Sequence, residues 1–128
     1  MAMTDSAAVA RLVEQSGSAG SELVLVLCTF PNPDDLGEIF TLLLREDLIA
    51  CANILRECHS VYKWRGEIVS NKEVLCLLKT QRACLEALAA RMTELHPYEV
   101  PELVVLSPSA VNEAYLAWVR EETAPPQP

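Results

Sequence analysis

The feature that most constrains this chain is a long β-hairpin expected between Ala50 and Thr80. Two β-rich runs meet at Arg65-Gly66, which suits a two-residue turn because glycine accepts a positive φ without a Cβ clash. Each arm is about 14 residues long, well beyond the ~5–6 residues of an ordinary strand. A hairpin of that length either overhangs its own domain or packs on a neighbour. Its apolar tip, with Val61, Tyr62 and Trp64, therefore points to self-association.

The middle of the hairpin interrupts its two-residue alternation. The base, Ala50–Leu55 against Val74–Thr80, is largely apolar on both faces, whereas the polar run 56–60 faces the polar run 70–73. No single alternation survives the whole length. We therefore expect a bulge or bend near these residues, separating a domain-bound base from a projecting tip.

The remaining segments predict two strands and three helices around the hairpin. The expected elements are a strand over Glu22–Phe30, a helix over Asp34–Asp47, a helix over Gln81–Leu95, a strand over Glu102–Leu106 and a helix over Asn112–Glu122. The order βαββαβ with an additional C-terminal helix predicts an α+β, ferredoxin-like antiparallel sheet, with both main helices on one face.

Two local features accompany the first helix. Asn32 or Asp34 is expected to cap it, since short polar side chains accept hydrogen bonds from free backbone N–H groups. Gly37 lowers helix propensity by ~1 kcal/mol relative to alanine, so we expect close packing at that position.

The ends of the chain differ from its middle in composition. Residues 1–21 are rich in Ala, Ser and Gly and are expected to form a flexible extension, with at most a weak helix over Ala8–Gln15. Residues 22–122 form the expected domain, and the Pro-rich residues 123–128 are expected to be a flexible tail.

Charge and cysteine content limit the partners and the compartment. The net charge is −8, which disfavours nucleic acid as a partner. No apolar run approaches the ~18–20 residues of a membrane span, so no membrane partner is expected. The five cysteines form no CxxC pair, and residues 1–20 lack the pattern of a signal peptide. The expected setting is a reducing cytoplasm with free thiols.

The densest polar group is the segment His96–Pro101, which offers an imidazole, a phenol and a carboxylate. From composition alone, a structural role as a helix stop anchored by Tyr98 is favoured by roughly two to one. Cys28 ends an apolar strand that neighbours the strand after His96 in this fold, so the two side chains could converge. A thiolate suits soft ions such as Cu(I), and imidazole suits copper and zinc. The alternative for Cys28 is an ordinary buried small hydrophobe.

No pattern of an enzyme is present. The sequence has no nucleophile elbow, no Gly-rich phosphate loop and no HExxH motif, and we expect no catalytic activity.

Several motifs together resemble one family, the divalent-cation tolerance proteins called CutA. They are Ala50-Cys51-Ala52-Asn53-Ile54, the run from Ser60 to Ile68, Glu73-Val74-Leu75, Lys79-Thr80, the run HPYEVPE from His96 to Glu102, and the run from Asn112 to Trp118. The resemblance covers about residues 22–122. The combination of HPYEVPE with YxWxG is far more specific than either motif alone.

The resemblance implies a homotrimer whose long hairpins pack across subunits, with Tyr62, Trp64 and Gly66 at the subunit contacts. It also implies tolerance of divalent cations, above all copper. The copper ligands it implies are Cys28 and His96, and Glu99 or a neighbouring subunit could complete the site. Some relatives carry a second histidine where this chain has Leu95, and many have Pro-Gly at the position of Arg56-Glu57.

Two alternatives belong to other functional classes. One is a trimeric sensor similar to the PII signalling proteins, in which Lys72, Lys79 or Arg82 would bind an anionic effector. The other is a structural adaptor with no ligand, which would act only through a protein partner.

Overall fold

The computed structural model describes residue 9 and residues 11–126. Its elements are β1 (Leu12–Glu14), β2 (Leu23–Phe30), α2 (Leu36–Arg45), β3 (Cys51–Trp64), β4 (Glu67–Gln81), a 3-10 turn (Arg82–Cys84), α3 (Leu85–Leu95), β5 (Val104–Leu106), β6 (Ala110–Asn112) and α4 (Glu113–Glu122). The predicted α+β class with antiparallel strands is confirmed, and every strand expected over residues 22–106 is present.

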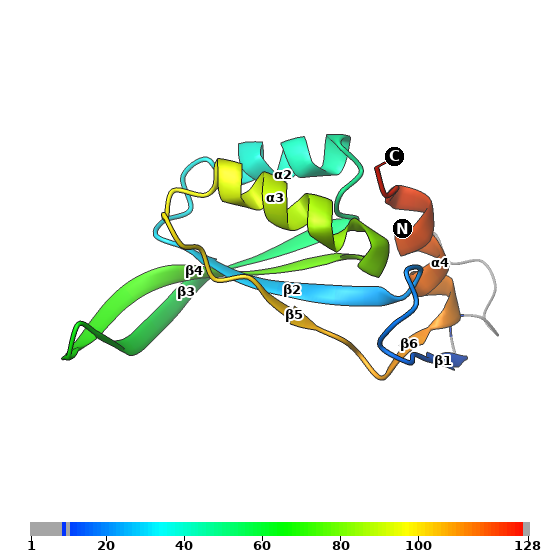
Figure 1. The fold of residues 1–128 in the computed structure, drawn as a ribbon, viewed down its shortest axis with the longest axis horizontal. Coiled ribbons are helices and arrows are strands. Elements are labelled where there is room, and N and C mark those ends of the chain that lie inside the picture. Colours follow the sequence, from blue (N-terminus) through cyan, green and yellow to red (C-terminus); the bar gives the residue numbers. More distant parts are fainter. Residues whose placement is uncertain (1–8, 10, 127–128) are drawn as a thin grey trace.

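The main sheet of the fold has four antiparallel strands in the order β3-β4-β2-β5. Helices α2 and α3 lie side by side on one face of it, while the β3–β4 hairpin projects beyond the helices (Figure 1). Strand β2 lies between β4 and β5, so both of its edges are paired. Its residues Val24, Val26 and Cys28 are buried, whereas Leu25 and Leu27 on the other face are only partly buried. The main core lies between the sheet and the two helices and includes Val26, Phe30, Phe40, Leu78 and Met92.

The hairpin follows the sequence prediction closely. Arg65 and Gly66 have φ values of 51° and 84°, as a two-residue turn with two left-handed positions requires. The register shifts between Leu55 and Cys58, so that two residues of β3, Arg56 and Glu57, oppose one residue of β4. The expected bulge is therefore confirmed at the boundary between the base and the tip.

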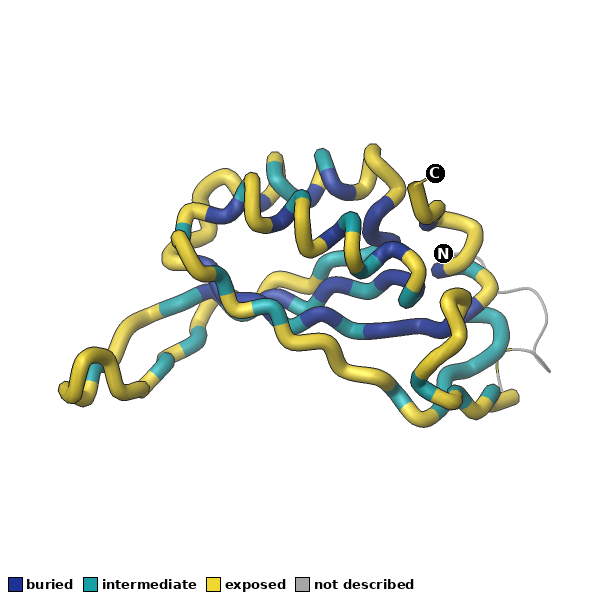
Figure 2. Tube along the Cα trace, in the orientation of Figure 1, coloured by how far each residue is buried: buried dark blue, intermediate teal, exposed yellow. Residues whose placement is uncertain are grey.

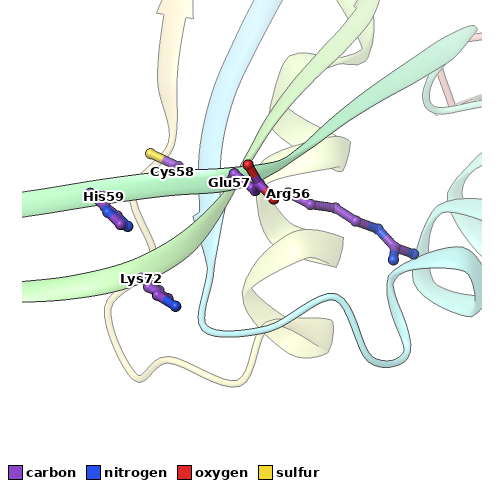
Figure 3. Close-up of a pocket in the computed structure, with 5 residues that line it drawn as sticks. All are labelled: Arg56, Glu57, Cys58, His59 and Lys72. Carbon is purple, nitrogen blue, oxygen red and sulfur yellow. The ribbon is translucent and has the colours of Figure 1, made fainter.

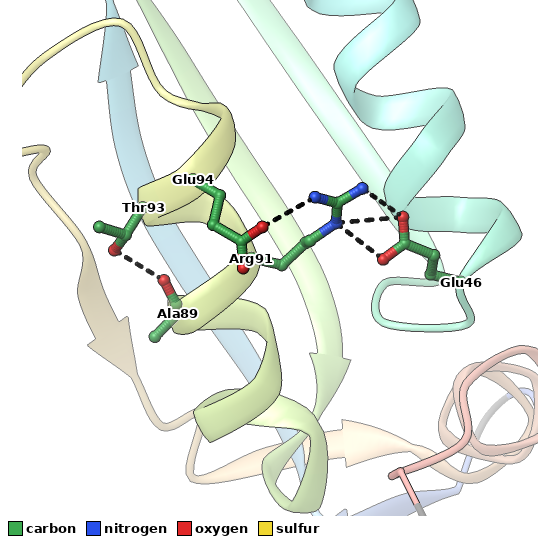
Figure 4. Close-up of polar contacts among 5 residues, drawn as sticks. All are labelled: Glu46, Ala89, Arg91, Thr93 and Glu94. Carbon is green, nitrogen blue, oxygen red and sulfur yellow. Dashed lines mark hydrogen bonds and ion pairs between the residues drawn. The ribbon is translucent and has the colours of Figure 1, made fainter.

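A salt bridge ties the two main helices together on the sheet. The guanidinium of Arg91 on α3 binds both carboxylate oxygens of Glu46 at the end of α2, with a shortest distance of 2.9 Å, and reaches Glu94 at 3.1 Å (Figure 4). Thr93 donates its hydroxyl hydrogen to the Ala89 carbonyl one turn earlier. The Arg91 side chain is 28% exposed, so water screens this pair only partly.

The described residues near both chain ends make specific contacts with the rest of the protein. Residues 1–8, 10 and 127–128 lie outside the described residues. Within the expected weak helix, Leu12–Glu14 instead form strand β1, which pairs with β6. The Gln15 side chain then bonds both the N–H and the carbonyl of Leu23, so residues 11–21 are attached to the domain. At the other end Thr123 is buried and accepts hydrogen bonds from Gln81.

Two expectations for the first helix were wrong. Neither Asn32 nor Asp34 caps it. Asp35 stands at the cap position with φ of 66°, and the Asn32 carboxamide oxygen instead accepts the Asp34 N–H. A Cβ placed on Gly37 would meet nothing within 4 Å, so no close packing explains that glycine.

None of the helices in the described part of the chain combines the length and apolar character needed to cross a membrane.

Candidate functional site

His96 ends α3 and is almost completely buried, with 7% of its surface exposed. Its ring stacks on Phe30 of β2, with the ring centroids 4.2 Å apart and the planes inclined by 26°. Strand β5 pairs only with Leu25–Leu27 of β2. His96 precedes β5 in the chain, and its ring binds β2 at a position that β5 does not reach.

Both ring nitrogens of His96 have partners. The backbone N–H of Tyr98 donates to Nδ1 at 3.0 Å, so the ring proton lies on Nε2 and is donated to the Thr29 carbonyl at 2.7 Å. A neutral imidazole has one donor and one acceptor, and both are in use here. Burial lowers the pKa of His96, against the opposing effect of the Thr29 bond. The ring is thus held neutral, with no nitrogen lone pair left for a metal ion.

Tyr98 continues this network towards the hairpin. Its hydroxyl donates to a carboxylate oxygen of Glu73 on β4 at 2.8 Å, and its ring centroid lies 5.0 Å from that of His96. Burial, together with the Glu73 carboxylate, raises the pKa of Tyr98 to about 12. The segment after α3 therefore joins β2 to β4 through an imidazole and a phenol, which supports the structural role favoured from composition.

Cys28 points into the core under the helices and has no exposed surface. It stands directly opposite Cys76 on β4, which is equally buried. The adjacent Cys76 thiol and burial raise the pKa of the Cys28 thiol. Since a metal ion binds the thiolate, the geometry favours a protonated, core-packed Cys28 in this conformation.

The three predicted metal ligands are not assembled into a binding site. Glu99 is exposed on the connection after His96, whereas Cys28 and His96 are buried. Across the described residues, no group of three or more His, Cys, Asp and Glu side chains is arranged to hold a metal ion. These residues do not fit a preformed metal centre, because the imidazole nitrogens are both bonded and the thiol is enclosed.

The residues expected at subunit contacts lie at the end of β3 and in the turn before β4. The projecting part of this hairpin is mostly exposed (Figure 2). Trp64 is 60% exposed and Tyr62 is 39% exposed, and Gly66 is in the turn between the strands. The Tyr62 hydroxyl accepts a hydrogen bond from the Asn71 side chain across the hairpin.

The three cations considered for an anionic effector have different surroundings. Lys79 lies over the ring of Tyr115 at 5.7 Å from its centroid, and Arg82 bonds the Ser107 hydroxyl. Lys72 instead lines a hollow in the middle of the hairpin.

Sequence reasoning missed the partners that define the surroundings of His96, namely Phe30, the Thr29 carbonyl and Glu73. Glu73 had a signal that could have been used, because it is a charged residue at the start of the apolar run Val74–Leu78. Nothing local in the sequence marks the Thr29 carbonyl, since every residue carries one.

Comparisons with known proteins agree with the motif resemblance. Residues 24–122 match the family described as CutA1 divalent ion tolerance protein. The chain is 45% identical to the divalent-cation tolerance protein CutA of Pyrococcus horikoshii, over 79% of this chain and 98% of that protein. It is 41% identical to the protein of the same name from Thermus thermophilus, over 77% of this chain and 96% of that one. The solved structure of CutA from Synechococcus elongatus PCC7942 superimposes with a TM-score of 0.82 at 29% identity, covering 91% of this chain and 99% of that one.

Proposed function

The chain belongs to the CutA1 divalent ion tolerance protein family, and we propose that it serves cation tolerance as a ferredoxin-like homotrimer without catalytic activity. Copper is the cation proposed first, and the reducing cytoplasm is the proposed compartment. All five cysteines are free, as that compartment would keep them.

The main support for the assembly is the apolar sheet face opposite α2 and α3. Helix α4 packs at one end of this face, near Leu25, and no other helix of the described residues covers the rest. Along β4 the side chains of Val74, Cys76 and Leu78 are buried under the helices, whereas Leu75 and Leu77 on the opposite face stay half-exposed. The same face continues onto the neighbouring strands, with Leu55 47%, Val104 42% and Leu106 43% exposed. Full burial of an exposed large apolar side chain contributes ~1.5–3 kcal/mol, and covering these half-buried ones contributes roughly half of that each.

The hairpin tip is a second exposed apolar surface, which burial in an assembly would stabilise. Val61 is 68%, Trp64 60% and Ile68 77% exposed. The tip and the sheet face are different surfaces of one chain, so a contact between them is heterologous, and repeating it closes a three-membered ring when each step rotates by one third of a turn. The number of three subunits comes from the family resemblance.

Mutation of each surface tests the assembly by light scattering at micromolar concentration. Leu55→Glu on the sheet face and Trp64→Glu at the tip are expected to reduce the mass below that of a trimer. Leu44→Glu is the matched control, because Leu44 is 41% exposed but lies on α2. The proposal fails if the wild-type chain is a stable folded monomer, or if Leu44→Glu dissociates the assembly as readily as the other two.

Copper binding by Cys28, His96 and Glu99 stays a prediction within this proposal. It requires the connection after α3 to open, because His96 must leave Thr29 to free a nitrogen and Cys28 must become accessible. Equilibrium dialysis with copper compares the wild type with Cys28→Ser, His96→Gln and Glu99→Gln. Lower stoichiometry in the variants, with the oligomeric mass unchanged, supports the prediction. Unchanged stoichiometry in all three removes these residues from any copper site.

A further inference from the structure

A hollow of about 300 Å³ lies in the middle of the hairpin, apart from the surroundings of His96. Five residues line it, namely Arg56, Glu57, Cys58, His59 and Lys72 (Figure 3). Its volume is at the lower end of the range of small-molecule sites, ~300–1,000 Å³.

The β-bulge creates this hollow. Arg56 and Glu57 are the two residues of β3 that lack individual partners on β4, so their side chains leave the regular alternation. Beyond the bulge, His59 stands directly opposite Lys72. Figure 3 shows these two side chains on the same side of the hairpin, with Arg56 reaching outwards from the bulge.

The charges lining the hollow differ from those of the chain as a whole. The chain carries a net charge of −8, yet the lining includes two basic side chains, Arg56 and Lys72, and a single carboxylate, although the Arg56 guanidinium extends away from Lys72 in Figure 3. Within the described range, no hydrogen bond or ion pair occupies the side chains of Arg56, His59 or Lys72, and all three are exposed. Donors without acceptors, gathered around a hollow, suit an anionic ligand. The planar fork of arginine matches the oxygen atoms of phosphate and carboxylate groups.

The same lining argues against a metal cation. Glu57, Cys58 and His59 offer oxygen, sulfur and nitrogen in sequence, but successive strand side chains alternate between faces. In Figure 3 the side chains of Cys58 and His59 lie on opposite sides of β3. Arg56 and Lys72 would in addition repel a positive ion at this position.

We propose that this hairpin pocket binds a small, multiply charged oxyanion through Arg56, His59 and Lys72. The ligand class comprises small molecules that carry a phosphate group or several carboxylates. The site is separate from cation tolerance and from Cys28 and His96. It uses residues at the bulge, where this chain carries Arg56-Glu57.

Isothermal titration calorimetry at low salt tests the proposal, with inorganic pyrophosphate and citrate as the two probes. The double variant Arg56→Gln/Lys72→Gln is expected to weaken binding of the preferred probe about tenfold or more. Lys63→Gln/Arg65→Gln is the matched control, since it removes two exposed cations from the same hairpin and leaves the pocket lining intact. The control is expected to change affinity by less than about threefold, because Lys63 and Arg65 are not among the lining residues and act on a bound anion only through long-range charge, and raising the salt should reduce that remaining effect.

The outcomes separate the explanations. Tighter binding of pyrophosphate assigns the pocket to phosphate groups, and tighter binding of citrate assigns it to carboxylates. The proposal is overturned if neither probe binds at millimolar concentration, or if both double variants lose affinity equally, which would indicate a general charge effect. Light scattering on the same samples shows whether assembly has changed, so failure of this proposal is distinguishable from failure of the homotrimer.

Discussion

Replacing His96 by phenylalanine tests the structural interpretation of the segment after α3. Phenylalanine keeps an aromatic ring that can stack on Phe30, but it removes both ring nitrogens. The Thr29 carbonyl and the Tyr98 N–H then lose their partners at a position where His96 itself is only 7% exposed. The substitution thus removes two hydrogen bonds with little change in volume.

The expected loss of stability follows from those two unpaired groups. A buried donor or acceptor left without a partner costs ~1–3 kcal/mol. The ring itself becomes more apolar in a buried place, which offsets part of that cost. We expect His96→Phe to lower the free energy of unfolding by about 2–4 kcal/mol at neutral pH, against a total of ~5–15 kcal/mol for an ordinary domain.

The pH dependence gives a second signature of the same ring. Burial lowers the pKa of His96 from its ordinary value of 6.5, so the unfolded state binds more protons than the folded state between the two values. Stability therefore rises with pH across that window. The contribution of the neutral ring is complete above about pH 6.5 and is lost as the pH falls through the folded-state value. This part of the pH dependence is expected to be absent in His96→Phe.

Urea unfolding at pH 5.5 and pH 7.5, followed by circular dichroism, measures both effects. Protein concentration must be the same for wild type and variant, because assembly adds to the apparent stability. NMR titration of the imidazole provides the folded-state pKa directly. The reasoning is refuted if the variant is within about 0.5 kcal/mol of wild type at pH 7.5, below the usual cost of one lost partner. A wild-type pH dependence that persists in the variant would also refute it.

Three further substitutions have smaller expected effects. Tyr98→Phe removes the bond to Glu73 and is expected to cost about 1–2 kcal/mol in urea unfolding; in wild type, the phenol pKa of about 12 should delay its absorbance change on alkaline titration. Arg91→Ala breaks the pair with Glu46 and is expected to cost about 0.5–1 kcal/mol, with a smaller difference at high salt; a cost that does not depend on salt would contradict the electrostatic explanation. Gly66→Val forces a branched side chain into a φ of +84° and is expected to cost about 1–2 kcal/mol in thermal unfolding. An unchanged midpoint for that variant would argue against the left-handed turn.

Much of the fold can be predicted from patterns of residue types within short stretches of the sequence. The central strand β2, the three helices and the long hairpin were all expected from periodicity and from turn residues. Strand β1 was missed because Leu12–Glu14 is a strand only through its pairing with β6, about a hundred residues later. Thr123 was placed in a tail for the same reason, since its partner Gln81 is remote in sequence.

The candidate site was predicted less completely than the fold. The residue types in the run from His96 to Pro101 were recognised, and their structural role was favoured, but Thr29 and Glu73 as partners were not foreseen. Convergence of Cys28 and His96 was inferred from strand order alone. In the structure, Cys28 faces Cys76, and His96 binds the backbone of Thr29, the residue directly after Cys28.

The sequence by itself determined the features that depend on neighbours along the chain. The turn at Arg65-Gly66 and the bulge at Arg56-Glu57 are of this kind, because backbone sterics and the alternation of side chains act over a few residues. Only the tertiary structure decided what the buried polar groups do. The strand register places Cys28 opposite Cys76. The packing of the segment after α3 brings both ring nitrogens of His96 into hydrogen bonds with backbone groups. The contacts with Cys76 and with the Thr29 carbonyl join residues far apart in the chain, whereas Tyr98 is only two residues from His96. The sequence pattern carries no signal for which remote partner satisfies a given donor or acceptor.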